Sequence, residues 1–167
     1  MPATLRDDVK KRHGFDSPRQ EAYLNLSRTQ SEASAALTAL LKTYGLSEAT
    51  YNILRILWGV DRYPDAGRRS LPCGEVAERM VTRVPDITRL MDRLEQAGLI
   101  ARERSDADRR VVLARISPAG RAMLRKLAPK VARVERAMFP ALSDRELATL
   151  SRLLEKARVV GECPGSG

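Results

Sequence analysis

The stretch that decides the fold is RVPDITRLMDRLEQAGLIARERSDADRRVVLARISPAG, residues 83–120. Apolar residues recur at spacings of three and four through its first part: Ile87, Leu90, Met91 and Leu94. This period predicts a helix with one apolar face. Pro85 suits a first helical position, because proline lacks the N–H that would stay unpaired there. Gly98 follows the last apolar repeat and predicts a left-handed helix stop, so we expect a helix over 84–97.

Two runs typical of β-strands follow the glycine, over 99–104 and 111–116. The polar residues 105–110 lie between them, and their aspartates suit a turn because the side chains accept hydrogen bonds from nearby N–H groups. The pattern predicts a hairpin whose tip carries Arg109 and Arg110. Arginine at a projecting tip suits the narrow, electronegative minor groove of DNA. For any single arginine, a solvated turn is the simpler interpretation.

A short helix is expected before this stretch, over 73–80, where Val76, Ala77 and Met80 keep apolar spacing. A tight turn over 81–84 joins it to the next helix. Two helices, a tight turn and a hairpin together describe a winged helix-turn-helix. In such a fold the second helix enters the major groove of DNA.

Helix-start signals lie on both sides of this segment. Ser17-Pro18 and Ser47 predict the starts of two helices before it, the first ending at about Tyr44 with Gly45 as its stop. Residues 61–72 contain three Pro and Gly residues and predict a loop. Further helix starts follow at Ser117-Pro118 and at the capping box of 143–146, with Pro129 expected to kink or interrupt the former helix.

The terminal helices have apolar faces without a globular core of their own, so they need a partner. A two-fold dimer meets that need and matches palindromic DNA half-sites. We therefore divide the chain into a charged N-terminal tail (1–16), a helical dimerisation region (17–45 and 118–160), a winged helix-turn-helix DNA-binding region (46–117) and a disordered C-terminal tail (161–167). The expected fold class is mainly α with a minor β part, a two-stranded β-wing.

The composition suits a polyanionic partner, since thirty basic against twenty-one acidic residues give a formal charge of +9. This charge does not choose between DNA, RNA and an anionic membrane surface. No run approaches the ~20 apolar residues of a membrane span. Residues 1–15 lack the apolar stretch of a signal peptide, so we expect a cytoplasmic location.

No cofactor, no metal site and no enzymatic activity are expected. Cys73 and Cys163 lie far apart without a C-x-x-C pair, and His13 is the only histidine. Cys73 near a helix start could act as a redox sensor, but a small, partly buried residue is the interpretation that we favour.

The chain resembles the MarR family of winged-helix bacterial regulators. The resemblance covers roughly residues 20–160 and rests on five segments: GLSEATYNILRILW (45–58), GEVAERM (74–80), ITRLMDRLEQAGLIAR (87–102), DRRVVLARISPAGRAML (108–124) and LSDRELATLSRLLEKAR (142–158). The Asp-x-Arg of the wing, Asp108 and Arg110, is the family's most specific mark. The resemblance implies a homodimeric regulator of transcription that binds palindromic operator DNA, most often as a repressor.

The candidate DNA-binding residues lie at the helix start and on the wing: Arg83, Pro85, Asp86, Thr88, Arg89, Arg93, Asp108, Arg109 and Arg110. We expect Arg110 to enter the minor groove, held by Asp108 through a charge-assisted bond. Arg109 is expected to contact phosphate or solvent. Asp86 is expected to orient an arginine, because a carboxylate is repelled by phosphate.

The resemblance also implies a cleft for a small aromatic or anionic effector, between the winged region and the dimer helices. Four residues could line it: Tyr44, Tyr51, Trp58 and Met123. For each of them alone, a place in the core is the simpler interpretation.

Other functions remain as alternatives. A winged helix can serve as a protein-interaction module without operator specificity. Sequence-specific RNA readers usually offer stacking aromatic residues, and the proposed reading surface has none. An enzyme is disfavoured, because no metal cluster, phosphate loop or nucleophile–base pair is evident.

Overall fold

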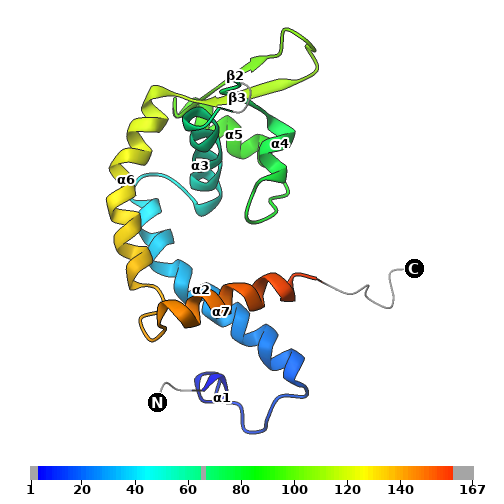
Figure 1. Ribbon diagram of the computed structural model, residues 1–167, viewed down its shortest axis with the longest axis vertical. Coiled ribbons are helices and arrows are strands. Elements are labelled where there is room, and N and C mark those ends of the chain that lie inside the picture. Colours follow the sequence, from blue (N-terminus) through cyan, green and yellow to red (C-terminus); the bar gives the residue numbers. More distant parts are fainter. Residues whose placement is uncertain (1–3, 65–66, 160–167) are drawn as a thin grey trace, which may run out of the picture. The chain divides into compact units, whose positions relative to one another are not determined.

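The computed structural model describes residues 4–64 and 67–159, and it divides into two compact units, 1–135 and 136–167. Its elements follow the chain in this order (Figure 1): α1 (Leu5–Asp8), α2 (Pro18–Lys42), α3 (Glu48–Arg62), β1 (Leu71–Pro72), α4 (Cys73–Glu78), α5 (Ile87–Gln96), β2 (Ile100–Arg104), β3 (Val112–Ile116), α6 (Pro118–Ala137) and α7 (Asp144–Ala157). The prediction of a mainly helical winged fold is confirmed. The expected disordered tail, 161–167, lies outside the described residues.

The sheet has three antiparallel strands in the order β1-β3-β2. β2 and β3 form the predicted hairpin, with Ile100 opposite Ile116 and Arg104 opposite Val112. The prediction of a two-stranded sheet was incomplete, because β1 pairs with β3 inside the segment that we expected to be a loop. Leu71 is 1% exposed and anchors this short strand. Pro72 lacks an N–H and therefore suits an edge strand.

Serine side chains cap three of the long helices, as predicted. The Oγ of Ser17 accepts a bond from the N–H of Gln20 (3.1 Å) at the start of α2. Ser47 and Ser143 form capping boxes at the starts of α3 and α7. Gly45, with φ of +71°, follows the end of α2 and confirms the predicted stop.

The start of α5 differs from the prediction that Pro85 is its first residue. Asp86 is the capping residue, its carboxylate accepting the N–H of Arg89 at 2.9 Å, and the helix begins at Ile87. A helix starting at Pro85 would have placed Val84 at the cap, where its side chain has no acceptor atom to offer. Gly98, with φ of +68°, ends the helix as predicted.

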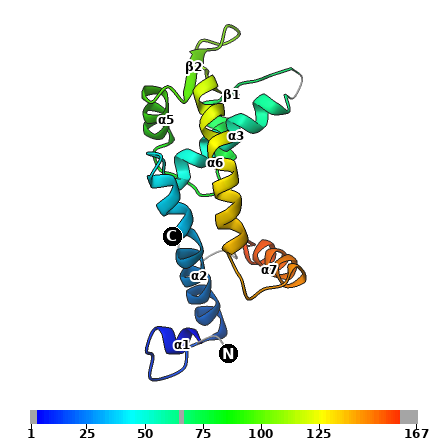
Figure 2. The same cartoon turned by 90° about the vertical axis from the view of Figure 1, so that its left-hand side faces the viewer.

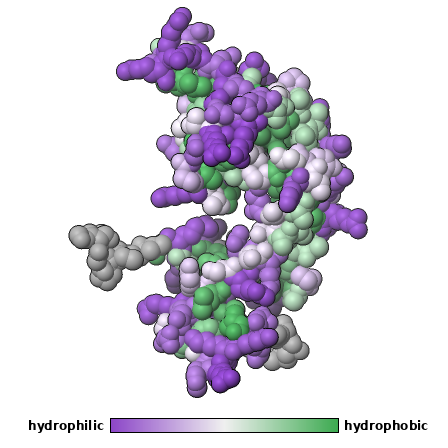
Figure 3. All heavy atoms as spheres, turned by 180° about the vertical axis from the view of Figure 1, so that it is seen from behind, coloured by the Kyte–Doolittle hydropathy of each residue, from purple (hydrophilic) through white to green (hydrophobic). Residues whose placement is uncertain are grey.

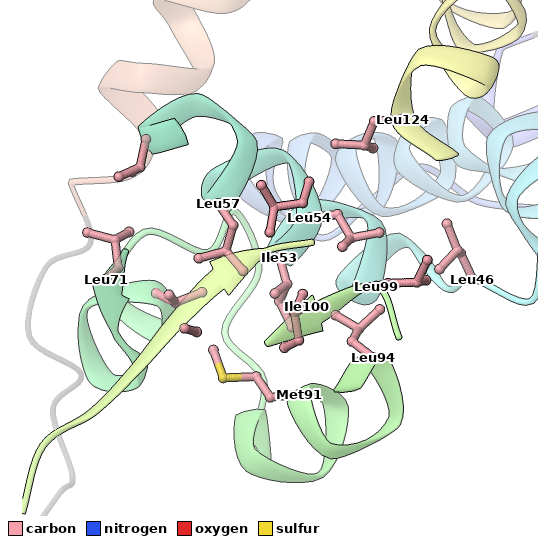
Figure 4. Close-up of a cluster of buried hydrophobic side chains, with 14 of the residues drawn as sticks. Leu46, Ile53, Leu54, Leu57, Leu71, Met91, Leu94, Leu99, Ile100 and Leu124 are labelled. Atoms are coloured by element: carbon pink, nitrogen blue, oxygen red, sulfur yellow. The ribbon is translucent and has the colours of Figure 1, made fainter. Parts of the chain in front are cut away.

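One apolar face of α3 forms the centre of the core in the unit 1–135. Ile53, Leu54 and Leu57 are almost fully buried. Figure 4 shows them in one cluster with Met91 of α5 and Ile100 of β2. α3 thus holds the second helix of the helix-turn-helix and the sheet through the same side chains.

α6 continues from Pro118 to Ala137 through Pro129, so of the kink or interruption expected there the interruption does not occur. Two contacts fix its first turns to the winged part of the chain. Ser117 donates its hydroxyl to the carbonyl of Gly98 (2.6 Å), and the guanidinium of Arg121 donates to the carboxylate of Asp61 in α3 (2.9 Å).

Gly120 permits the close approach of α6 to the sheet. A Cβ at this position would overlap the backbone carbonyl oxygen of Leu99 and lie 2.8 Å from the Cγ1 of Ile116. A backbone oxygen cannot swing aside as a long side chain can.

The second unit consists, in its described part, of the end of α6, a turn and α7. α7 contains no buried residue, and Leu153 is half exposed on it. Leu147, Leu150 and Leu154 are half-buried on the same helix. Its predicted capping box is confirmed, but α7 lacks an enclosed core among the described residues.

The packing at Gly120 predicts opposite effects for two glycine-to-alanine variants. Gly120→Ala should lower the free energy of unfolding by about 1–3 kcal/mol, because the added methyl group forces the helix and sheet apart. Gly59→Ala should raise it by about 0.5–1 kcal/mol, because this helical glycine has no atom within 4 Å of an added Cβ. Urea unfolding measures both, and an unchanged Gly120→Ala variant would contradict the close approach.

Candidate nucleic-acid interface

The start of α5 offers an exposed polar surface. The candidates of this region are all exposed: Arg83, Pro85, Asp86, Thr88, Arg89 and Arg93. Met91 and Leu94, on the opposite face of the helix, are buried in the core. Packing therefore fixes which side of α5 faces outward, and the candidates share that side or the segment that leads into it.

Asp86 has a structural task at this surface. We expect from the sequence that Asp86 orients an arginine side chain. Instead, its carboxylate accepts a hydrogen bond from the main-chain N–H of Arg89. A negative charge at a helix start is favourable, because the first N–H groups carry partial positive charge.

The wing holds the forked pair expected from the Asp-x-Arg motif. Arg110 donates from Nε and Nη2 to the two carboxylate oxygens of Asp108, both at 3.2 Å, and from its main-chain N–H at 3.0 Å. These hydrogen bonds lower the pKa of Asp108, first of all the bonds from the guanidinium. The Arg110 side chain is 91% exposed, so its guanidinium is oriented by Asp108 and still accessible to a ligand.

The rest of the wing supports this tip. Arg104, which sequence reasoning did not single out, donates to the main-chain carbonyl of Arg109 at 3.0 Å and braces the turn. The side chain of Arg109 itself is exposed. Figures 1 and 2 both show the β2–β3 hairpin projecting beyond the helices around it, and Figure 3 shows hydrophilic side chains gathered on the projection.

A second feature missed by sequence reasoning joins α5 to β2, and we call it the Arg102 clamp. Arg102 donates its main-chain N–H and its Nε to the carboxylate of Glu95, both at 3.0 Å. Its Nη2 also donates to Glu95 (2.7 Å) and to Asp92 (2.5 Å). The bonds from Arg102 lower the pKa of Glu95, and those from Glu95 raise the pKa of Arg102. Glu95 and Arg102 therefore stay ionised at neutral pH.

A side chain from another helix also stabilises the turn between α4 and α5. The side-chain oxygen of Asn52, in α3, accepts the N–H of Val81 at 2.9 Å. Val81 is 89% exposed, so this apolar side chain stands in the solvent beside the start of α5. A bond between residues so far apart in sequence leaves no local pattern that could have revealed it.

Comparison with known proteins agrees with this geometry. The model of the MarR family matches residues 46–112, from the end of the α2–α3 connection to the first residue of β3. The crystal structure of a MarR transcription factor from Planctomyces limnophilus is 37% identical, with a TM-score of 0.64, and the match covers 85% of this chain and 98% of that one. The chain belongs to the MarR family. It is therefore a MarR-family transcriptional regulator with a winged helix.

Two more distant structures share the MarR fold. Sco3205 from Streptomyces coelicolor, a MarR family regulator in complex with DNA, is 22% identical with a TM-score of 0.72 over 86% of this chain and 92% of that one. BpsR from Bordetella bronchiseptica, whose DNA binding is regulated by 6-hydroxynicotinic acid, is 21% identical with a TM-score of 0.73 over 89% of this chain and all of that one.

In this MarR-family chain, two of the four candidate effector residues lie together. Tyr44 and Met123 line a cavity of about 520 Å³ with Lys42, Arg93 and Leu94. Tyr51 lines a different cavity, of about 400 Å³. Trp58 lines neither of these, and its ring lies 5.9 Å from the guanidinium carbon of Arg55.

Three further observations concern Cys73, metal ligands and membrane spans. Burial raises the pKa of the Cys73 thiol, which disfavours the reactive thiolate at neutral pH. Within residues 4–64 and 67–159, no cluster of His, Cys, Asp and Glu side chains could hold a metal ion. In the same residues, no helix combines the length and the apolar character needed to cross a membrane.

Proposed function

We propose that this MarR-family regulator acts as a homodimer that binds palindromic operator DNA as a repressor, with α5 in the major groove and the wing in the adjacent minor groove. The observation that carries the proposal is the guanidinium of Arg110, exposed at the wing tip yet oriented by both oxygens of Asp108. An arginine oriented before binding loses less side-chain freedom when it enters a groove.

The charges around α5 support the same binding mode. Arg83, Arg89 and Arg93 are exposed and take part in no ion pair within the part of the chain that the structure describes. Such cations can neutralise phosphates, which supplies the sequence-independent part of DNA affinity. Thr88 and Arg89, in the first turn of α5, offer the hydrogen-bonding groups that can read base edges.

Exposed apolar side chains support the proposed dimer. Tyr23, Leu24 and Leu26 of α2 are exposed, and α7 has no buried residue. Helices with uncovered apolar faces are stabilised by a partner, and a second copy of the chain provides two matching faces by symmetry.

Selection of bound fragments from random DNA tests this function. We expect an enriched, palindromic sequence whose half-sites are centred about 10 bp apart or a multiple of that distance, because the two α5 helices must enter major grooves on one face of the duplex. No enrichment, together with recovery of an acidic protein partner, would instead favour a protein-interaction module. A parallel selection from random RNA that enriches single-stranded sequences, while the DNA selection enriches none, would favour an RNA reader.

The role of the wing is tested with Arg110→Ala on the selected operator. We expect affinity to fall by about 1–3 kcal/mol and the salt dependence to lose about one unit of slope, because one groove cation is lost. The matched control is Arg109→Ala, which removes the same charge one residue away without touching the forked pair and should weaken binding less. Wild-type affinity of Arg110→Ala at two salt concentrations would show that the wing assignment is wrong.

We further propose that a small aromatic anion releases the DNA by binding the 520 Å³ cavity beside Tyr44. Lys42 and Arg93 line it, and the ammonium groups of Lys126 and Lys130 lie 5.5 and 5.3 Å from the centre of the Tyr44 ring. Leu94 and Met123 add apolar walls. Because Arg93 and Leu94 belong to α5, an occupant would touch the proposed recognition helix directly.

A thermal-shift series with phenolic acids, beginning with salicylate, tests this cavity. We expect a rise in Tm and release of the operator, since a ligand that binds the folded state stabilises it. Tyr44→Ala should abolish the rise, whereas Tyr51→Ala, in the other cavity, should leave it. A series that causes neither stabilisation nor release would contradict the proposal, and loss of the rise in Tyr51→Ala alone would move the site to the second cavity.

A further inference from the structure

The Arg102 clamp lies between the two elements that are proposed to read DNA. Arg102 belongs to β2, the first strand of the wing, while Glu95 and Asp92 belong to the C-terminal half of α5. We infer that Arg102 is a positioning residue for DNA binding, fixing the direction in which the wing leaves α5 so that both reach their grooves together. The inference rests on the proposed function.

The bonds of the clamp restrain the strand as well as the side chain. Glu95 accepts from both the main chain and the guanidinium of Arg102, so the backbone of β2 is held against α5 at this residue. Asp92, one turn earlier on α5, accepts from the same guanidinium. Bonds to carboxylates on two successive turns fix the angle of the guanidinium plane as well as its distance from the helix.

A series of hydrogen bonds connects Arg102 with the tip of the wing. Arg102 lies opposite Ala114 in the β2–β3 pairing, which sets the register of the hairpin. Two residues further on, Arg104 bonds the carbonyl of Arg109. Arg110 follows directly and bonds Asp108. The orientation of the tip therefore depends on how the base of β2 is fixed.

Arg102 does not act by touching DNA itself. Its side chain is 19% exposed, and its Nε and Nη2 donate to Glu95 and Asp92. Arg110, by contrast, is almost fully exposed. A wholly structural role for Arg102 would change the stability of the fold and leave the contact made by Arg110 intact in the folded protein.

The experiment is a double-mutant cycle on operator affinity that combines Arg102→Met with Arg110→Ala in the full chain. We expect Arg110→Ala to weaken binding about tenfold in the wild type but less than about twofold in Arg102→Met, because a misdirected wing has no minor-groove contact left to lose. Affinities are measured well below the Tm of each variant, with the active fraction determined by titration.

The matched control background is Arg115→Met. Arg115 lies on β3 opposite Ala101, is half exposed and has its nearest carboxylate, that of Glu103, at 3.9 Å. Its loss removes the same charge from the same sheet without freeing α5 from β2. In this background Arg110→Ala should keep its full, about tenfold effect.

An equal loss from Arg110→Ala in the wild-type and Arg102→Met backgrounds would overturn the inference and leave the proposed function standing. No loss from Arg110→Ala in the wild type would overturn the wing contact of the proposed function, and the inference with it. If Arg102→Met does not fold, the double variant Arg102→Met with Glu95→Gln replaces it. The second substitution removes the unpaired charge of Glu95, and the effect of Arg110→Ala is measured in this background in the same way.

Discussion

Burial of one face of α3 is the constraint on which the rest of the winged unit depends. Ile53, Leu54 and Leu57 exclude water almost completely, and burial of each contributes about 1.5–3 kcal/mol. The same face receives side chains from α5 and the sheet. Core packing therefore determines which side of α5 faces the solvent. Its arginines are exposed because Met91 and the leucines on the opposite side pack into the core.

Local signals predicted much of this fold from the sequence. These signals are the serine caps, the left-handed glycines and the runs of residues typical of β-strands. Each depends on interactions among a few neighbouring residues, so a short stretch of sequence is enough to recognise it. Asp86 and Pro85 show where two local rules competed, because a side-chain acceptor at the cap outweighed a proline suited to a first turn. β1 escaped notice because two residues are too few to show a period, and its stability comes from pairing with β3.

In the candidate site, too, contacts between neighbouring residues could be predicted and contacts between separate elements could not. Asp108 and Arg110 are two residues apart, so their pairing could be expected from the sequence and is present in the structure. The Arg102 clamp and the bond from Val81 to Asn52 join separate elements, and no local pattern specifies which charged side chains meet. Likewise, Tyr44 and Tyr51, which seemed to belong to one group, line different cavities, because the surface that each side chain reaches depends on tertiary packing.

α5 connects these features in one helix. Its first turn carries the exposed candidates Thr88 and Arg89, its next turns carry the carboxylates of the clamp, and Arg93 reaches the cavity beside Tyr44. A ligand in that cavity and a DNA duplex would therefore both contact the same short helix. Any effect of one on the affinity of the other must be reciprocal, because both act through a shared folded state. The helix proposed to read the operator is thus also the element through which release would be transmitted.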